Sequence, residues 1–265
     1  MRHAYRTALV TGASSGIGES FARLLAADGC DLVLAARRAD RLNDLAAQLR
    51  DEHKIDVTVL PADLTTAGGM DTVAARLAGS GLPAGQAPIE LLVNNAGRSA
   101  RGNFADQPPE IVDAQITLNV MALTRLARAA VGGMLERGHG GILNVSSMSG
   151  FAASPGSPVY GATKAFVTSL SESLHAELAG TGVHVTALCP GLTRTEFHEA
   201  NHVDLGYLPK LAWLEADDVA RAGLDAVAEG RAMVVPGVQY KLAAGATRLL
   251  PRGALRRMTR LVRSG

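Results

Sequence analysis

Seven short apolar runs recur along the chain, and segments with helical periodicity separate them. The runs show no polar alternation on either face, which is typical of parallel strands that are buried on both sides. They lie at residues 8–10, 32–35, 57–60, 91–93, 142–145, 183–188 and 233–235. Because parallel strands need crossover connections, and these are right-handed, the pattern predicts an α/β fold: a doubly wound parallel sheet of about seven strands flanked by helices.

The composition is that of one compact domain. Of 265 residues, 47% are hydrophobic, 19% charged and 4% aromatic, which excludes disordered and collagen-like chains. No connection is rich enough in Gly, Pro or Ser to separate two domains, and the nearest, residues 79–88, falls between a predicted helix and a predicted strand. We therefore predict a single domain over residues 1–237 and a C-terminal extension over residues 238–265.

Cys30 and Cys189 are too few for a disulfide framework, and no long hydrophobic segment precedes the first predicted strand. We therefore expect a cytoplasmic protein. Each apolar run ends within about ten residues, short of the roughly 18 to 20 residues that a membrane-spanning helix needs. Contact with a membrane surface stays open.

The formal net charge of +1 conceals an uneven distribution. The chain has 26 Lys and Arg against 25 Asp and Glu, and this balance argues against a nucleic-acid partner. Residues 231–265 hold eight of the basic residues and no acidic one, so the first 230 residues hold 18 basic and 25 acidic residues and carry a charge of −7. The sequence thus predicts an acidic body with a basic helical tail.

On a helical wheel, the apolar and the basic side chains of the tail fall on two separate sides. Its apolar side is Leu255, Met258, Leu261 and Val262, and its basic side is Arg256, Arg257, Arg260 and Arg263. Such an amphipathic helix would bind an anionic membrane surface or an acidic carrier of an acyl substrate. Alternatively, it would pack on the body with a solvated arginine face.

A glycine-rich turn, TGASSGIG at residues 11–18, lies between the first predicted strand and a predicted helix. Gly12 allows the tight turn out of the strand, Gly16 lets the backbone approach a pyrophosphate, and Gly18 lets the helix pack on the sheet. The free N–H groups and positive dipole end of the helix favour a phosphate at this place. A glycine-rich turn alone can also be a packing turn, but its position after a strand favours a dinucleotide site.

The residues after the second predicted strand indicate which dinucleotide binds. An acidic residue there would hold the ribose 2′-hydroxyl of NAD, whereas this chain has Arg37 and Arg38. A guanidinium group matches a 2′-phosphate, so NADP(H) is the favoured cofactor and Arg37 the main contact, with Ser14 and Arg38 as helpers. Alternatively, the arginines only solvate the start of a helix.

Further polar residues suited to chemistry follow the fourth and fifth predicted strands. Tyr160 and Lys164 stand at i and i+4, so both side chains share one helical face. A tyrosine with its ordinary pKa of about 10 is a poor acid–base group at neutral pH, and a neighbouring ammonium group favours its phenolate. Ser147 would lie across the same cleft, where its hydroxyl could bind the substrate oxygen whose charge changes.

The order of TGASSGIG (11–18), NNAG (94–97), Ser147 and the Tyr160–Lys164 pair resembles that of the short-chain dehydrogenase/reductase superfamily in its single-domain form, over about residues 7–195. The resemblance implies a Rossmann-type sheet and a catalytic tetrad of Asn119, Ser147, Tyr160 and Lys164. By this resemblance Tyr160 exchanges a proton with the substrate oxygen and Ser147 orients that oxygen. Lys164 lowers the tyrosine pKa and binds ribose, and Asn119 positions a water for a proton relay.

The resemblance also implies that Asp63 contacts the adenine, that residues 94–97 line the cofactor and steady the sheet, and that residues 190–195 close over the nicotinamide. The predicted cofactor-binding residues are Gly12, Ser14, Ser15, Gly16, Ile17, Gly18, Arg37, Asp63, Leu64, Asn95, Ala96, Gly97, Tyr160, Lys164, Pro190, Gly191, Thr193 and Thr195. Many NADP-preferring relatives carry a basic residue where this chain has Ser15, so the predicted preference depends mainly on Arg37.

No metal site is expected, because no histidine pairs with Cys, Asp or Glu at metal-ligand spacing. His198 and His202 stand at i and i+4 in a predicted lid, and we interpret them as structural or solvated, with metal binding as the alternative. Cys189 is interpreted as a buried, inert thiol. Ser146 neighbours Ser147, but the spacing in the family selects Ser147.

The residues expected to line the cleft are mostly apolar, which favours a hydrophobic ketone, aldehyde or acyl chain over a sugar. They are Arg98, Phe104, Met148, Phe151, Pro155, Val159, Phe197 and the stretch 192–211. The leading hypothesis is an NADPH-dependent oxidoreductase that interconverts a carbonyl and an alcohol by hydride transfer. The alternatives are a 3-oxoacyl-thioester reductase of lipid metabolism and a non-catalytic NADP-binding regulator or scaffold. Two long predicted helices, near residues 109–136 and 158–179, suggest a homo-oligomer, either a dimer or a tetramer.

Overall fold

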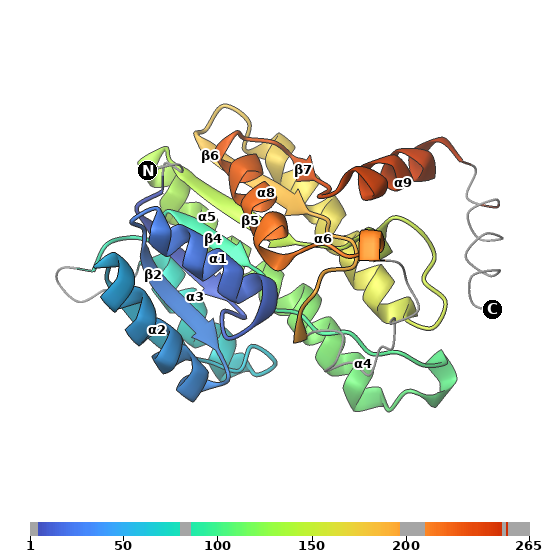
Figure 1. Ribbon diagram of the computed structural model, residues 1–265, viewed down its shortest axis with the longest axis horizontal. Coiled ribbons are helices and arrows are strands. Elements are labelled where there is room, and N and C mark those ends of the chain that lie inside the picture. The colour runs from blue at the N-terminus through green and yellow to red at the C-terminus, as the bar shows by residue number, and fades with distance from the viewer. Residues whose placement is uncertain (1–4, 80–85, 197–209, 251–252, 254–265) are drawn as a thin grey trace.

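The computed structural model describes residues 5–79, 86–196, 210–250 and 253. Its strands are β1 (Thr7–Thr11), β2 (Asp31–Ala36), β3 (Val57–Pro61), β4 (Leu91–Asn94), β5 (Gly140–Val145), β6 (Val183–Leu188) and β7 (Met233–Val234). They form one seven-stranded parallel sheet in the order β3-β2-β1-β4-β5-β6-β7 (Figure 1). Each predicted apolar run coincides with one of these strands, and the predicted doubly wound α/β fold is confirmed.

Helices connect the strands and cover the sheet. They are α1 (Gly16–Ala27), α2 (Ala39–His53), α3 (Ala67–Ala78), α4 (Pro109–Ile116), α5 (Leu123–Arg137), α6 (Pro158–Glu177), α8 (Ala216–Ala228) and α9 (Val238–Leu249). Shorter elements are the 3-10 turns η1 (Phe104–Asp106), η3 (Met148–Gly150) and η4 (Lys210–Ala212), and the π-helical turn η2 (Thr117–Ala122). The helix predicted near residues 109–136 is therefore α4 and α5 with a π turn between them.

Successive side chains of a strand enter two separate hydrophobic cores, one on each face of the sheet. Val10 packs with Phe21 of α1 in the core that α1, α2 and α8 cover. Leu9 packs with Leu126 of α5 in the core that α3 and α5 cover. Because both faces are covered, apolar side chains predominate on each, and this explains why the strands appear in the sequence as apolar runs.

The strand order places the functional edge of the sheet. β1 pairs with β2 on one side and with β4 on the other, so the connections after β1 and β4 leave in opposite directions. A crevice forms at the carboxyl ends of the strands at such a point, and ligands bind there in open α/β sheets. The loops that follow β1, β4, β5 and β6 meet at this edge.

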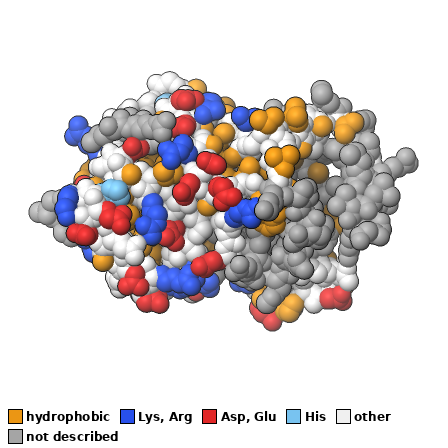
Figure 2. Space-filling model, in the orientation of Figure 1, with side chains coloured by type: hydrophobic (Ala, Val, Ile, Leu, Met, Phe, Trp, Pro, Cys, Tyr) orange, Lys and Arg blue, Asp and Glu red, His pale blue; other side chains and the backbone are white. Residues whose placement is uncertain are grey.

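α9 lies beyond the last strand and extends away from the sheet (Figure 1). Val238 and Leu242 on this helix are exposed, and Figure 2 shows hydrophobic side chains gathered over it. The predicted extension begins at the first residue of α9, but its basic stretch, residues 254–263, lies outside the described residues. Within the described part of the chain, no helix combines the length and the apolar character needed to cross a membrane.

Candidate active site

The glycine-rich turn connects the end of β1 to the start of α1. α1 begins at Gly16, with Ser15 as its N-cap in an extended conformation. A Cβ atom at Gly18 would collide with the carbonyl oxygen of Gly12, so the first turn of α1 can approach the end of β1 only because residue 18 is glycine. The N–H groups of the first turn of α1 therefore face the crevice, as anion binding requires.

The segment that follows β4 fixes this turn to the sheet. The hydroxyl oxygen of Thr11 accepts hydrogen bonds from the N–H groups of Asn95 and Ala96, each at 3.0 Å. The side-chain amide of Asn95 donates to the carbonyl oxygen of Thr11 at 2.9 Å. These bonds join the carboxyl ends of β1 and β4, which is the steadying role expected of residues 94–97.

Asn94 extends the polar connection into the interior. Its side-chain amide donates to Asn144 of β5 at 3.0 Å, and Asn144 donates to Ser171 of α6 at 3.0 Å. All three side chains are buried. Since an unpaired buried amide would be costly, the chain of bonds fixes β4, β5 and α6 in one relative position.

Asp63, predicted to lie at the adenine, is held in a turn before α3. One carboxylate oxygen accepts hydrogen bonds from the N–H and the hydroxyl of Thr65, at 2.9 and 2.7 Å. Burial alone would raise the pKa of Asp63, but the Thr65 bonds and the charges of Arg37 and Arg98 leave it below its ordinary value. Asp63 is therefore an ionised acceptor at neutral pH. The neighbouring Leu64 is buried.

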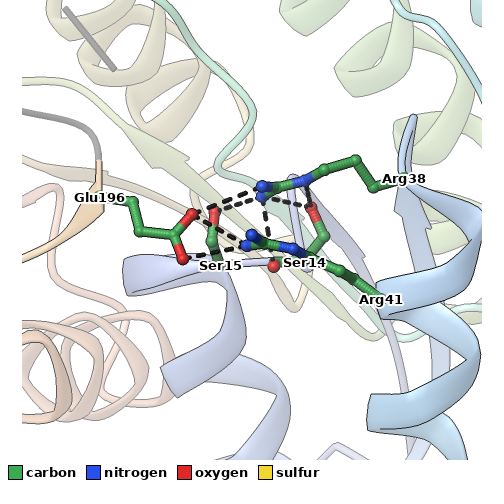
Figure 3. A network of polar contacts seen from close by, with 5 residues as sticks. All are labelled: Ser14, Ser15, Arg38, Arg41 and Glu196. Carbon is green, nitrogen blue, oxygen red and sulfur yellow. Dashed lines mark hydrogen bonds and ion pairs between the residues drawn. The ribbon is translucent and has the colours of Figure 1, made fainter. Parts of the chain in front are cut away.

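Arg38, rather than Arg37, lies against the glycine-rich turn (Figure 3). Its Nη2 donates to the hydroxyl oxygens of Ser15 at 2.8 Å and of Ser14 at 3.1 Å. Arg37 is exposed, and its charge acts on Asp63. The sequence favoured Arg37 and treated Arg38 as a helper, whereas these contacts bring Arg38 to the serines.

Arg41 and Glu196 join this cluster (Figure 3). The sequence predictions gave Arg41 no role and included Glu196 only in the stretch 192–211 expected to line the cleft. Nη1 of Arg41 donates to the two carboxylate oxygens of Glu196 at 3.0 and 2.9 Å, and Nη1 of Arg38 lies 3.4 Å from one of them. The i, i+3 spacing of the two arginines was a usable signal, because such residues share a helix face. No sequence signal links Glu196 to them.

The predicted catalytic residues meet between β5 and α6. Nζ of Lys164 lies 5.7 Å from the centre of the Tyr160 ring and donates to the carbonyl oxygen of Val145 at 2.7 Å. Burial lowers the pKa of the Lys164 ammonium group to about 8. Burial raises the pKa of Tyr160, and a side-chain hydrogen bond with Ser147 offsets part of that rise. Tyr160 is thus a neutral phenol in this state, in contact with the Ser147 hydroxyl.

The two neighbouring serines face different partners. The Ser146 hydroxyl donates to the carbonyl oxygen of Lys164 at 2.7 Å and so holds the backbone of α6. The Ser147 hydroxyl oxygen accepts from the N–H of Ser149 at 3.1 Å and is left in contact with Tyr160. Cys189 is buried and forms no disulfide, and burial raises its pKa to about 11. Its interpretation as an inert thiol stays a prediction.

Asn119 lies in the π turn between α4 and α5. Its side-chain oxygen accepts from the N–H of Arg98 at 2.9 Å, and its amide donates to the carbonyl oxygen of Arg98 at 2.9 Å and to the Thr163 hydroxyl at 3.1 Å. A Cβ atom at Gly97 would lie 3.4 Å from the Asn119 side chain and 3.5 Å from Nζ of Lys164. The π turn therefore places Asn119 on the same side of Gly97 as Lys164, and the water-positioning role of Asn119 stays a prediction.

The segment after β6 runs along the crevice from the catalytic residues to the glycine-rich turn. At its start the carbonyl oxygen of Pro190 accepts from the N–H of Met148 at 3.0 Å. Near its end Thr195 lies above Gly16, where an added Cβ would approach the Thr195 side chain to 3.1 Å. Thr193 is buried and forms a β-bridge with Leu214. The predicted lid residues Phe197, His198 and His202 lie outside the described residues.

Tyr240 of α9 anchors this segment, and the sequence reading assigned it no role. Its hydroxyl accepts from the N–H of Leu192 at 3.0 Å and donates to the carbonyl oxygen of Ala212 at 2.6 Å. Its ring occupies the space that a side chain at residue 191 would need, so the backbone of Gly191 rests directly on the ring. A helix of the predicted extension is therefore part of the site's framework. Among the described residues, no group of three or more His, Cys, Asp or Glu is arranged to hold a metal ion.

Comparison with known proteins gives a consistent result. The family model described as short chain dehydrogenase matches residues 6–205. An uncharacterized oxidoreductase of Staphylococcus epidermidis is 36% identical over 217 residues, which cover 82% of this chain and 88% of that protein.

Two solved structures with related sequences have the same fold. A short-chain dehydrogenase from Sphingobium yanoikuyae in complex with NADPH is 40% identical, with a TM-score of 0.82 and coverage of 91% of this chain and 93% of that chain. A bulky-bulky ketone specific alcohol dehydrogenase from Comamonas testosteroni is 34% identical, with a TM-score of 0.78 and coverage of 92% of each chain.

Proposed function

The chain belongs to the short-chain dehydrogenase family of oxidoreductases, and from this membership we propose that it is an NADPH-dependent enzyme that interconverts a hydrophobic carbonyl compound and its alcohol. One observation carries the proposal: the hydroxyl groups of Ser147 and Tyr160 are hydrogen-bonded, and the Lys164 ammonium lies 5.7 Å from the tyrosine ring. Two hydroxyl groups and a cation at this edge of the sheet suit a substrate oxygen that gains or loses a proton.

The residues around the crevice fit a dinucleotide. Gly18 permits the close approach of α1 to β1, which leaves the first-turn N–H groups for a pyrophosphate. Arg38 and the two serines beside it suit a 2′-phosphate, because guanidinium and hydroxyl groups donate to phosphate oxygens. The nicotinamide ring of the bound cofactor supplies or takes the hydride. The similar protein from Sphingobium yanoikuyae is in complex with NADPH, which supports the preference.

In the direction of reduction, Tyr160 donates its proton to the carbonyl oxygen of the substrate. Ser147 donates a hydrogen bond to the same oxygen and so fixes the substrate relative to Tyr160. Lys164 is mainly protonated at neutral pH, because its pKa of about 8 lies above that range, and its charge stabilises the phenolate that proton donation leaves. The oxidation of an alcohol follows the same contacts in reverse.

We propose a hydrophobic substrate, because apolar residues were expected around the cleft and because the similar protein from Comamonas testosteroni is specific for bulky-bulky ketones. In the described part of the chain, Met148 directly follows Ser147, Val159 directly precedes Tyr160, and Phe151 is the C-cap of η3. Thioesters of 3-oxoacyl chains are a second class to test, since one similar structure, 30% identical, is a putative betaketoacyl-ACP reductase.

The decisive experiment is a screen of ketones, aldehydes and 3-oxoacyl thioesters with NADPH and with NADH, followed by the loss of cofactor absorbance. We expect turnover of at least one hydrophobic carbonyl class, faster with NADPH than with NADH at equal low concentration. The double variant Ser147→Ala/Tyr160→Phe, which lacks both hydroxyl groups, is the blank. A protein that binds NADPH but reduces none of these compounds would instead be a cofactor-binding regulator or scaffold.

We further propose a cytoplasmic homo-oligomer, dimer or tetramer. The single catalytic domain predicted over residues 1–237 is proposed to include α9 as well, because Tyr240 of that helix anchors the segment after β6. Apolar side chains exposed on α5 and α6, among them Leu135 and Phe166, support association through these helices, which light scattering would test. The basic tail stays a proposal for contact with a membrane surface or an acidic acyl carrier. Co-sedimentation of the full chain, and of a truncation after Gly253, with anionic vesicles tests the membrane contact, and equal binding by both removes it.

A further inference from the structure

Two arginines and one carboxylate form a compact charged cluster beside the glycine-rich turn (Figure 3). Arg38 is the N-cap of α2 and Arg41 lies in its first turn, whereas Glu196 comes from the segment after β6. Arg41 contacts both oxygens of the carboxylate, at 3.0 and 2.9 Å, and Arg38 contacts one oxygen at 3.4 Å. Residues that are more than 150 positions apart in the sequence therefore share one anion.

Arg38 uses all of its nitrogen atoms in this arrangement. Nε and Nη2 donate to the Ser14 hydroxyl oxygen at 3.3 and 3.1 Å, Nη2 also donates to Ser15, and Nη1 faces Glu196. The two serines orient the guanidinium plane through Nε and Nη2, and the carboxylate of Glu196 contacts the remaining nitrogen, Nη1. The guanidinium group best placed for a 2′-phosphate is therefore already in contact with an internal anion.

Glu196 is ionised at neutral pH. A hydrogen bond from Arg41 is the main reason that the pKa of Glu196 lies below its ordinary value. Burial opposes this lowering, and the charges of Arg41 and Arg38 and the hydrogen bond from Arg38 add to it. Its carboxylate and a 2′-phosphate both offer oxygen acceptors to the same planar donors. An anionic side chain at this position also repels a second anion.

We propose that Glu196 is a specificity-determining residue, whose carboxylate competes with the 2′-phosphate of NADP(H) for the guanidinium groups of Arg38 and Arg41. The inference rests on the proposed NADP(H) preference and deepens it. NAD(H) carries a hydroxyl group in place of this phosphate, so the competition leaves its affinity unchanged. Glu196 thereby limits how strongly the enzyme prefers NADP(H).

Arg41 moderates this competition. The two contacts of Arg41 with the carboxylate are shorter than the single contact of Arg38. Arg41 therefore has the stronger electrostatic interaction with Glu196. Because Glu196 interacts more weakly with Arg38, the positive charge of Arg38 can still attract the 2′-phosphate. Without Arg41, Glu196 would interact with Arg38 alone, and the competition would become stronger.

The size of the effect follows from exposure. The side chains of Arg38, Arg41 and Glu196 are 41%, 45% and 52% exposed, so water screens their interactions. Exposed ion pairs of this kind change a binding constant by about twofold to fivefold. We expect an effect in this range.

The test is isothermal titration calorimetry of the full chain with adenosine 2′,5′-bisphosphate and with AMP, followed by NADPH and NADH. These adenosine ligands lack the nicotinamide, so the measurement does not depend on turnover. In Glu196→Gln we expect the Kd of the bisphosphate and of NADPH to fall by about twofold to fivefold, with AMP and NADH unchanged. Unchanged or weaker binding of the bisphosphate by this variant overturns the inference.

A matched control separates a local effect from the change in net charge. Glu229 pairs with Arg231 at 2.8 Å at the opposite edge of the sheet and is also exposed, so Glu229→Gln removes the same charge far from the site. An equal gain in Glu229→Gln would overturn the inference. We also expect Glu196→Gln to strengthen bisphosphate binding more in an Arg41→Met background than in the wild type, and an equal or smaller gain there overturns the role given to Arg41.

The outcomes also separate the inference from the proposed function. A wild type that binds the bisphosphate no more tightly than AMP overturns the proposed NADP(H) preference, and the inference with it. A wild type that prefers the bisphosphate, with an affinity that Glu196→Gln leaves unchanged, overturns the inference alone.

Discussion

The two ends of the crevice differ in how far their charged and polar side chains are exposed to solvent. At the end with the predicted catalytic residues, which we call the catalytic end, Asn119, Lys164 and Ser147 are 1%, 5% and 8% exposed, so their interactions act in a medium that screens little. At the other end, beside the glycine-rich turn, where we propose that the adenosine of the cofactor binds, Arg38, Arg41 and Glu196 are about half exposed, and water screens their interactions. We therefore expect a substitution at the catalytic end to change the reaction rate by orders of magnitude, whereas a substitution among the exposed charges changes cofactor preference in small steps.

The largest effect is expected for Tyr160→Phe. The substitution keeps the ring beside Lys164 but removes the proton that the substrate oxygen receives. We expect kcat to fall by about 10²- to 10⁴-fold, the usual contribution of general acid–base catalysis, while the Kd of NADPH changes by less than about twofold. Stopped-flow turnover and fluorescence titration with NADPH measure the two quantities. A kcat within about tenfold of the wild type would show that another group donates the proton.

Lys164→Met tests whether burial sets the energetics of the catalytic end. The folded-state pKa of Lys164, about 8, lies below its ordinary value of 10.5, so the unfolded chain binds more protons between these values. Stability therefore rises with pH across this window, by about 3 kcal/mol for a shift of this size. Below pH 8 the folded protein bears the full cost of a buried ammonium group.

Denaturant unfolding of the cofactor-free protein, from about pH 7 to pH 10.5, checks this expectation. The difference in the free energy of unfolding between wild type and Lys164→Met should change with pH in the stated direction. The substitution also leaves the carbonyl oxygen of Val145 without its donor, but that loss does not depend on pH. A difference that stays constant would mean that Lys164 titrates near its ordinary pKa and that this end is better solvated than its burial suggests.

Arg38→Ala is expected to have an intermediate effect that depends on the cofactor. Because Arg38 is the arginine in contact with Ser14 and Ser15, we expect the KM for NADPH to rise about tenfold, the effect of losing one charge-assisted hydrogen bond, and that for NADH to stay within about twofold. Arg37→Ala should shift the preference in the same direction by less. Equal effects on NADPH and NADH in both variants would remove the 2′-phosphate assignment from this end of the crevice.

The sequence predicted those features of the fold and the site that depend on residues close together in the chain. Buried parallel strands read as apolar runs, and Tyr160 and Lys164 share a face because they are four residues apart on a helix. The choice between Arg37 and Arg38 depends instead on the backbone at the N-cap of α2, which the sequence does not reveal. The π turn that carries Asn119 was likewise hidden inside a pattern that predicts one continuous helix over residues 109–136.

Contacts between segments that are distant in the chain could not be predicted from the sequence, for a different reason. Glu196 meets Arg41 across 155 positions, and Tyr240 meets Leu192 across 48. No periodicity encodes such a pairing, because it depends on how the loops after β6 and β7 pack at the edge of the sheet. We predicted residues 238–265 to be an extension outside the catalytic domain, and Tyr240 was therefore not expected in the site. In the structure, α9 contributes this residue to the framework of the site.

Tyr240→Phe tests whether the two ends of the crevice are linked. The segment that Tyr240 holds begins beside Ser147 and ends at Glu196, and the substitution keeps the ring against Gly191 while removing two hydrogen bonds. At about 1 kcal/mol per bond, and with water able to replace part of the loss, we expect kcat/KM to fall about fivefold for the carbonyl substrate. NADPH affinity should fall with it, which steady-state kinetics and titration would measure. A fall in thermal stability with unchanged kinetics would show that Tyr240 only supports the fold.

The smallest effect is expected from salt, and it distinguishes the two ends without any substitution. The Debye length falls from about 14 Å to about 4 Å between 0.05 and 0.5 M NaCl, which weakens interactions among half-exposed charges but scarcely affects buried ones. We therefore expect the preference for NADPH over NADH to fall about threefold over this range, while kcat at saturating NADPH stays nearly constant. Glu196→Gln should remain the tighter NADPH binder at low salt and approach the wild type at high salt, since screening weakens the repulsion that the substitution removes. If kcat fell with salt as steeply as the cofactor preference, the catalytic residues would be as open to solvent as the arginines, and the contrast between the two ends would be wrong.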